Sequence, residues 1–130
     1  MRRLALCLPL IGICVGFPFA AGAQTKSLSE FGIVLMHGKG GGPDGLIASL
    51  AAALTGNGAI VVSPAMPWQG TKGVPRGYTE TYDQAIEKID RVVADLKSRG
   101  AKRIVVAGQS FGANAALAYA SRRGQNLAAV

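Results

Sequence analysis

The sequence predicts an α/β fold, a three-layer αβα arrangement around a mostly parallel sheet. Short apolar runs and helical patterns alternate three times between residues 31 and 123, mostly with short turns between them. This alternation is typical of a parallel sheet whose helices lie on both faces. The first run, residues 31–36, contains no polar side chain, as expected for a strand that helices cover on both sides.

Residues 1–23 have the composition of a secretory signal peptide. The segment carries two arginines at its start, continues without a charge to residue 20, and ends in the small-x-small pattern Ala21-Gly22-Ala23. We therefore expect export to the periplasm or the cell exterior, with residues 24–130 as the mature chain and no membrane anchor left after cleavage. An uncleaved anchor is the alternative, but the segment is short for a membrane span and contains two prolines.

The formal net charge of +7 arises from 14 basic and 7 acidic residues. Basic residues such as Lys97 and Arg122 lie near the ends of predicted helices, where the helix dipole favours cations. Since no basic patch is interleaved with aromatic residues, we expect no nucleic-acid partner. Cys7 and Cys14 both lie in the predicted signal peptide, and no cluster of histidine, cysteine or carboxylate predicts a metal, so we expect no cofactor.

The first half of the mature chain contains two predicted strands, residues 31–36 and 59–63, with a helix between them. Pro43 or Asp44 suits the start of this helix, because both residue types are favoured at helix N-termini. A loop rich in proline and glycine follows the second strand and occupies residues 64–78. Apolar side chains recur at helical spacing and predict the buried face of the helix: Leu46, Ile47, Leu50 and Leu54.

The second half begins with a longer helix, which Thr81 and Gln84 can start by a capping box and which Gly100 ends. Its predicted buried face consists of Tyr82, Ile86, Ile89, Val93 and Leu96. The elements after it are a third strand, a third helix and the start of a fourth strand, at residues 103–107, 111–122 and 126–130.

Residues 108–112 read Gly-Gln-Ser-Phe-Gly and stand between the third predicted strand and its helix. This Gly-x-Ser-x-Gly layout is that of a nucleophile elbow, in which a serine sits on a sharp strand-to-helix turn. We expect the turn to force an unusual backbone conformation on Ser110, and a side chain at Gly108 or Gly112 to collide across the bend. A serine in an ordinary strand-to-helix loop is the alternative.

The chain resembles the α/β-hydrolase family over residues 31–130. The resemblance rests on residues 37–41, a His-Gly-Lys-Gly-Gly turn after an apolar strand, and on the Gly-x-Ser-x-Gly elbow behind it. It implies that Ser110 is the nucleophile of a serine hydrolase acting on an ester or related acyl bond of a small molecule. It further implies an oxyanion hole made by the backbone amides of Phe111 and of Lys39 or a neighbour in its loop.

His37 is the only histidine in the sequence. The resemblance implies that His37 and Gly38 have a structural role in the oxyanion loop, because the family orders its triad as serine, acid, histidine. A general base for Ser110 is the alternative. Trp68 is a candidate for lining the substrate pocket, since its loop also leaves a strand at the carboxyl end of the sheet; packing of that loop onto the sheet is the alternative.

Residues 111–130 contain no Asp, Glu or His, so the acid and the base that the family places after the serine are missing from them. Without a base, a serine hydroxyl is a poor nucleophile at neutral pH. We therefore expect residues 24–130 to be the N-terminal portion of an α/β-hydrolase domain, truncated after the helix that follows the nucleophile. The alternative function is a non-catalytic α/β-hydrolase-like binding or pseudo-enzyme domain that keeps the elbow as architecture.

Overall fold

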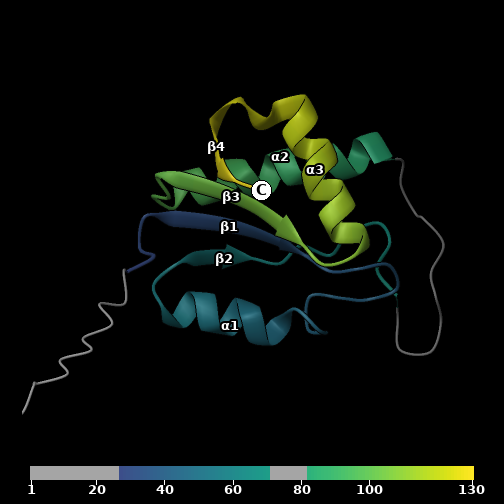
Figure 1. The fold of residues 1–130 in the computed structure, drawn as a ribbon, viewed down its shortest axis with the longest axis horizontal. Coiled ribbons are helices and arrows are strands. Elements are labelled where there is room, and N and C mark those ends of the chain that lie inside the picture. The colour runs from purple at the N-terminus through teal and green to yellow at the C-terminus, as the bar shows by residue number, and fades with distance from the viewer. Residues whose placement is uncertain (1–26, 71–81) are drawn as a thin grey trace, which may run out of the picture.

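The computed structural model describes residues 27–70 and 82–130. The predicted signal peptide, Thr81 of the predicted capping box and part of the loop after the second strand lie outside these residues. Within them, strands and helices alternate along the chain as the sequence predicts (Figure 1). The elements are β1 (Phe31–Met36), α1 (Ala48–Gly56), β2 (Ile60–Val62), α2 (Tyr82–Ser98), β3 (Arg103–Gly108), α3 (Phe111–Arg123), a 3₁₀ turn (Gly124–Asn126) and β4 (Leu127–Ala129).

The four described strands form one parallel sheet in the order β2-β1-β3-β4. The predicted parallel α/β fold is therefore confirmed. β1 pairs with β3 along its whole length, and Met36 at the end of β1 stands opposite Gly108 at the end of β3. Because these two ends are level, the loops that follow β1 and β3 begin side by side at one edge of the sheet.

Helices cover both faces of the sheet, which gives three layers. On one face, Val34 and Met36 of β1 join a buried cluster with residues of α2 and α3, including Ile89. On the other face, Ile33 and Leu35 of the same strand form a second cluster with side chains from the α1 region. Figure 1 shows α1 on the opposite side of the sheet from α2 and α3. This alternation along β1 is what a strand covered on both sides requires.

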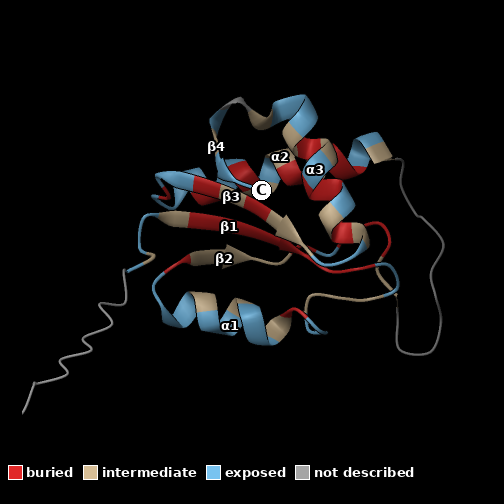
Figure 2. Ribbon diagram, viewed as in Figure 1, coloured by how far each residue is buried: buried red, intermediate tan, exposed pale blue. Residues whose placement is uncertain are grey.

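The helix predicted after β1 begins later than expected and buries less. It starts at Ala48, not at Pro43 or Asp44, because two turns closed by hydrogen bonds between backbone groups precede it. Ile47, the residue before the helix, is buried, but Leu46 and Leu50 are 85% and 50% exposed. The predicted apolar face is therefore wrong at these two leucines. Figure 2 shows α1 without a fully buried residue.

The apolar face predicted for α2 is confirmed, and Tyr82, the first residue of the helix, is partly buried. The buried residues of this helix are Ala85, Ile86, Ile89, Val93 and Leu96. α2 and α3 are also joined by polar contacts, in which the Tyr119 hydroxyl donates a hydrogen bond to Asp90 over 2.9 Å and Arg123 pairs with the same carboxylate. None of the helices in residues 27–70 and 82–130 is long and apolar enough to cross a membrane.

Candidate active site

Ser110 stands on the sharp turn between β3 and α3. Its backbone has φ 55° and ψ −117°, and it is the one non-glycine residue with positive φ in the described part of the chain. Such a conformation costs on the order of 1–3 kcal/mol in a residue with a side chain, so the surrounding structure must hold it. Ser110 is exposed and immediately precedes the first residue of α3. The backbone geometry expected of the elbow is therefore present.

Two glycines allow the chain to make this turn. A Cβ on Gly108 would lie 2.5 Å from the carbonyl oxygen of Gly112, across the bend. A Cβ on Gly112 would lie 2.6 Å from the carbonyl oxygen of Met36 and 2.8 Å from that of His37. These distances are too short for non-bonded atoms, so α3 can approach the end of β1 this closely because both positions are glycine.

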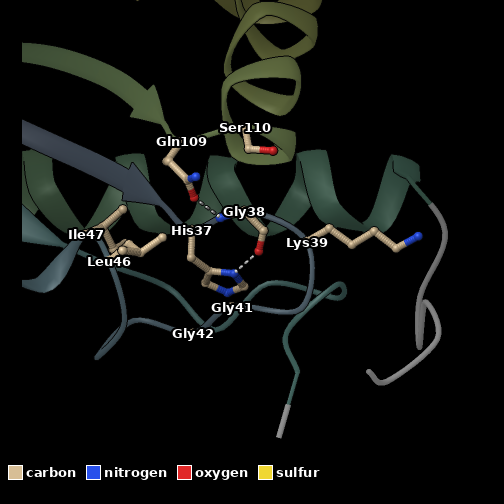
Figure 3. Close-up of a pocket in the computed structure, with 9 residues that line it drawn as sticks. All are labelled: His37, Gly38, Lys39, Gly41, Gly42, Leu46, Ile47, Gln109 and Ser110. Carbon is tan, nitrogen blue, oxygen red and sulfur yellow. Dashed lines mark hydrogen bonds between the residues drawn. The ribbon is translucent and has the colours of Figure 1, made fainter. Parts of the chain in front are cut away.

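The loop after β1 is held by His37, whose ring is buried. Met66 donates its backbone N–H to Nε2 of the ring, at 3.3 Å, so that nitrogen is the acceptor. The other nitrogen, Nδ1, carries the proton and donates to the carbonyl oxygen of Gly38 at 2.8 Å (Figure 3). Both ring nitrogens of His37 are thus engaged with backbone groups, which leaves this ring no nitrogen in position to act as a base.

Trp68 ties a second loop to the first. Its indole N–H donates to the carbonyl oxygen of His37 at 2.9 Å, and its own carbonyl accepts the N–H of Gly40 at 2.9 Å. Gly70 adds a further bond, from its N–H to the carbonyl of Gly41 at 3.0 Å. The side chain of Trp68 is 1% exposed, so its burial and its paired N–H agree with the packing interpretation of this residue.

Phe111, which follows Ser110, is anchored by aromatic contacts. Its ring meets Trp68 edge-on at a centroid distance of 4.9 Å and Tyr82 at 6.3 Å. Burial raises the pKa of Tyr82, and the nearby Arg122 partly opposes that rise. These contacts link the start of α3 to the loop that carries Trp68, and through it to the oxyanion loop predicted from the sequence.

A pocket of about 150 Å³ opens beside Ser110 (Figure 3). Its lining comes from the loop between β1 and α1 and from the elbow: His37, Gly38, Lys39, Gly41, Gly42, Leu46, Ile47, Gln109 and Ser110. Four residues that the sequence associates with one site, His37, Gly38, Lys39 and Ser110, therefore lie together. Trp68 is not among the described lining residues.

Three of the lining side chains are not anticipated from the sequence. The sequence predicts Leu46 and Ile47 on the helix face, and Gln109 stands at a variable position of the Gly-x-Ser-x-Gly pattern. A local signal existed for Leu46, because glycine-rich sequence directly before it predicts a loop in preference to a helical turn. Gln109 has no such signal, since its partner is Gly38, on another loop.

In residues 27–70 and 82–130, no group of three or more His, Cys, Asp or Glu side chains could hold a metal ion. Comparison with known proteins gives one family: residues 30–130 match the model described as Serine aminopeptidase, S33. No curated protein matches the chain, and no solved structure does. The matched segment begins just before β1 and includes every element described above.

Proposed function

Since the chain belongs to the serine aminopeptidase (S33) family of α/β-hydrolases, we propose that its site serves acyl transfer with Ser110 as the nucleophile. The observation that carries the proposal is the strained, exposed serine on a glycine-flanked turn, beside a loop whose peptide groups are held in place. The proposed substrate is a small molecule with an ester or related acyl bond. A space of ~150 Å³ is enough for a group of about benzene's size.

Support for Ser110 as nucleophile comes from its place in the fold. The turn lifts its side chain away from the sheet and into the lining of the pocket. The helix that starts at the next residue directs its N-terminal dipole toward the same point, where negative charge develops during attack on a carbonyl.

Support for an oxyanion hole comes from the orientation of the Gly38–Lys39 peptide. The Gly38 carbonyl accepts hydrogen bonds from His37 Nδ1 at 2.8 Å and from the Gly41 N–H at 3.1 Å. In a trans peptide, C=O and N–H point in opposite directions, so the Lys39 N–H points away from the His37 ring. We assign one oxyanion donor to this amide and the other to the amide of Phe111, the residue after the serine. Removing one donor of this kind costs about 3 kcal/mol in the barrier.

The hydroxyl proton needs an acceptor. His37 is committed to backbone groups at both nitrogens, so its ring is not placed to accept that proton. This observation favours a second candidate function, a non-catalytic α/β-hydrolase-like domain that binds a ligand in the pocket beside Ser110. Hydrolysis requires a general base, whereas binding does not.

The test is labelling of Ser110 by a fluorophosphonate, with and without added imidazole as a base in solution. In this reaction Oγ forms a bond to phosphorus, fluoride leaves, and the proton passes to the base. We expect labelling of the wild-type chain, accelerated by imidazole, and its loss in Ser110→Ala. Ser121→Ala is the matched control, because Ser121 is an exposed serine on α3, and it should label normally.

Intact mass and peptide mapping would report the modified residue. A folded wild-type chain that labels no faster than Ser110→Ala, even with imidazole, would exclude Ser110 as a nucleophile. If the unlabelled wild-type chain still bound substrate analogues, and Ser110→Ala bound them equally tightly, the binding function would replace acyl transfer as the proposal.

A further inference from the structure

Gln109 connects the elbow to the loop after β1. Its side-chain oxygen Oε1 accepts the backbone N–H of Gly38 at 3.1 Å (Figure 3). The backbone N–H of Gln109 donates to the carbonyl of Met36 at 2.9 Å. Gly38 and Gln109 are 71 residues apart in sequence, so this side chain bonds the loop after β1 to the loop after β3. Gln109 is exposed, so packing in the core does not hold its side chain in this orientation.

Gly38 is held from both ends. Its N–H is bonded by Gln109, and its carbonyl is bonded by the His37 ring. A Cβ on Gly38 would lie 2.6 Å from Oε1 of Gln109, so the glutamine side chain can approach this closely because residue 38 has no side chain. With both polar groups of one residue fixed, the peptide unit that carries the Lys39 N–H has little freedom to rotate.

We propose that Gln109 is a positioning residue that sets the distance between the two loops carrying the oxyanion donors. The inference rests on the proposed function, because a donor has to be positioned only where an oxyanion forms. The Lys39 amide belongs to the loop after β1, whereas the Phe111 amide belongs to the elbow. Gln109 joins the two loops directly: it lies two residues before Phe111, and its partner Gly38 lies one residue before Lys39. Donors of this kind act through preorganisation, so a small displacement lowers the rate without unfolding the protein.

The test compares two substitutions at Gln109 in the full chain. Gln109→Met keeps the length of the side chain and removes the acceptor oxygen. Gln109→Glu keeps an acceptor that can bind the Gly38 N–H. Asn114→Ala is the control, since Asn114 is an exposed residue in the first turns of α3 outside the proposed machinery.

Two readouts are needed. Amide hydrogen exchange at Gly38, followed by NMR, should be about 10-fold faster in Gln109→Met and near the wild-type rate in Gln109→Glu and Asn114→Ala. The rate of Ser110 labelling by the fluorophosphonate should fall about 10- to 100-fold in Gln109→Met, because one donor is displaced without being removed. The melting temperature should change little, which separates positioning from a general loss of structure.

The outcomes distinguish this inference from the proposed function. Labelling of Gln109→Met at the wild-type rate would overturn the positioning role, and so would unchanged exchange at Gly38. If the wild-type chain failed to label at all, the proposed acyl transfer would fall. Faster Gly38 exchange in Gln109→Met alone would then still support the connection between the two loops, and unchanged exchange would refute it.

Discussion

The two faces of the sheet differ in how much they bury. Of the residues that the structure describes, the seven largest fully buried side chains all belong to the cluster on the α2–α3 face: Trp68, Met36, Ile89, Leu96, Ile104, Val34 and Val106. On the α1 face, four of the described residues are buried, and α1 itself contributes none of them (Figure 2). Alternate residues of the same strands thus have very different surroundings.

This difference corresponds to two roles. The α2–α3 face supports the elbow, because α3 starts at Phe111 and that ring packs on Trp68 and Tyr82. The pocket beside Ser110 is lined on its other side by Leu46 and Ile47, which precede α1. The α2–α3 face therefore holds the strained Ser110 in place, and the α1 face leaves room for a ligand to reach it.

The largest effect that would test this comparison is expected from a core truncation on the α2–α3 face. Ile89 is fully buried, so Ile89→Ala should lower the free energy of unfolding by about 4 kcal/mol through lost burial and a cavity. Leu50→Ala, on half-exposed α1, should cost no more than about 0.5 kcal/mol. Urea titrations of both variants measure the contrast, and equal losses would show that the two faces contribute alike.

A smaller effect is expected from closing the turn at α3. Gly112→Ala brings a methyl group against the carbonyls of Met36 and His37 and should cost about 2–3 kcal/mol. Gly56→Ala at the end of α1 is the matched control, since nothing lies within 4 Å of its Cβ position, and it should be neutral or stabilise by up to ~1 kcal/mol. Thermal melts compare the two, and a tolerated Gly112→Ala would mean that α3 is not tightly held against β1.

The parts of this fold that depend on local patterning could be predicted from the sequence. The apolar β-branched runs gave the strands, and the spacing of Ile86, Ile89 and Val93 gave the buried face of α2. The Gly-x-Ser-x-Gly pattern predicts the turn, because a side chain at either glycine would collide with the backbone in so sharp a bend. Each of these signals lies within one element and its immediate neighbours.

What could not be predicted depends on contacts between separate loops. Helical spacing predicts burial of Leu46, Ile47 and Leu50 alike, but tertiary packing buries Ile47 and leaves the two leucines exposed. The bonds of Trp68 to His37 and of Gln109 to Gly38 span 31 and 71 residues. No local pattern records which distant carbonyl a buried indole N–H will find, although its need for a partner was foreseeable.

The smallest effect concerns the seam between the two helices of the α2–α3 face. Burial and the hydrogen bond to Asp90 raise the pKa of Tyr119 to about 12, with Arg123 opposing them, against 10.0 for a free tyrosine. Below pH 10 the hydroxyl is protonated in both the folded and unfolded states, so its contribution to stability is complete. Above pH 10 the unfolded state ionises first, and the contribution is lost as the pH rises toward 12. Tyr119→Phe should therefore be less stable than wild type at pH 8 by about 1 kcal/mol, the lost hydrogen bond, and this deficit should shrink by pH 11.5. Urea titrations at several pH values measure it; a deficit that stayed constant would show that the Tyr119–Asp90 bond does not join α2 to α3 in solution.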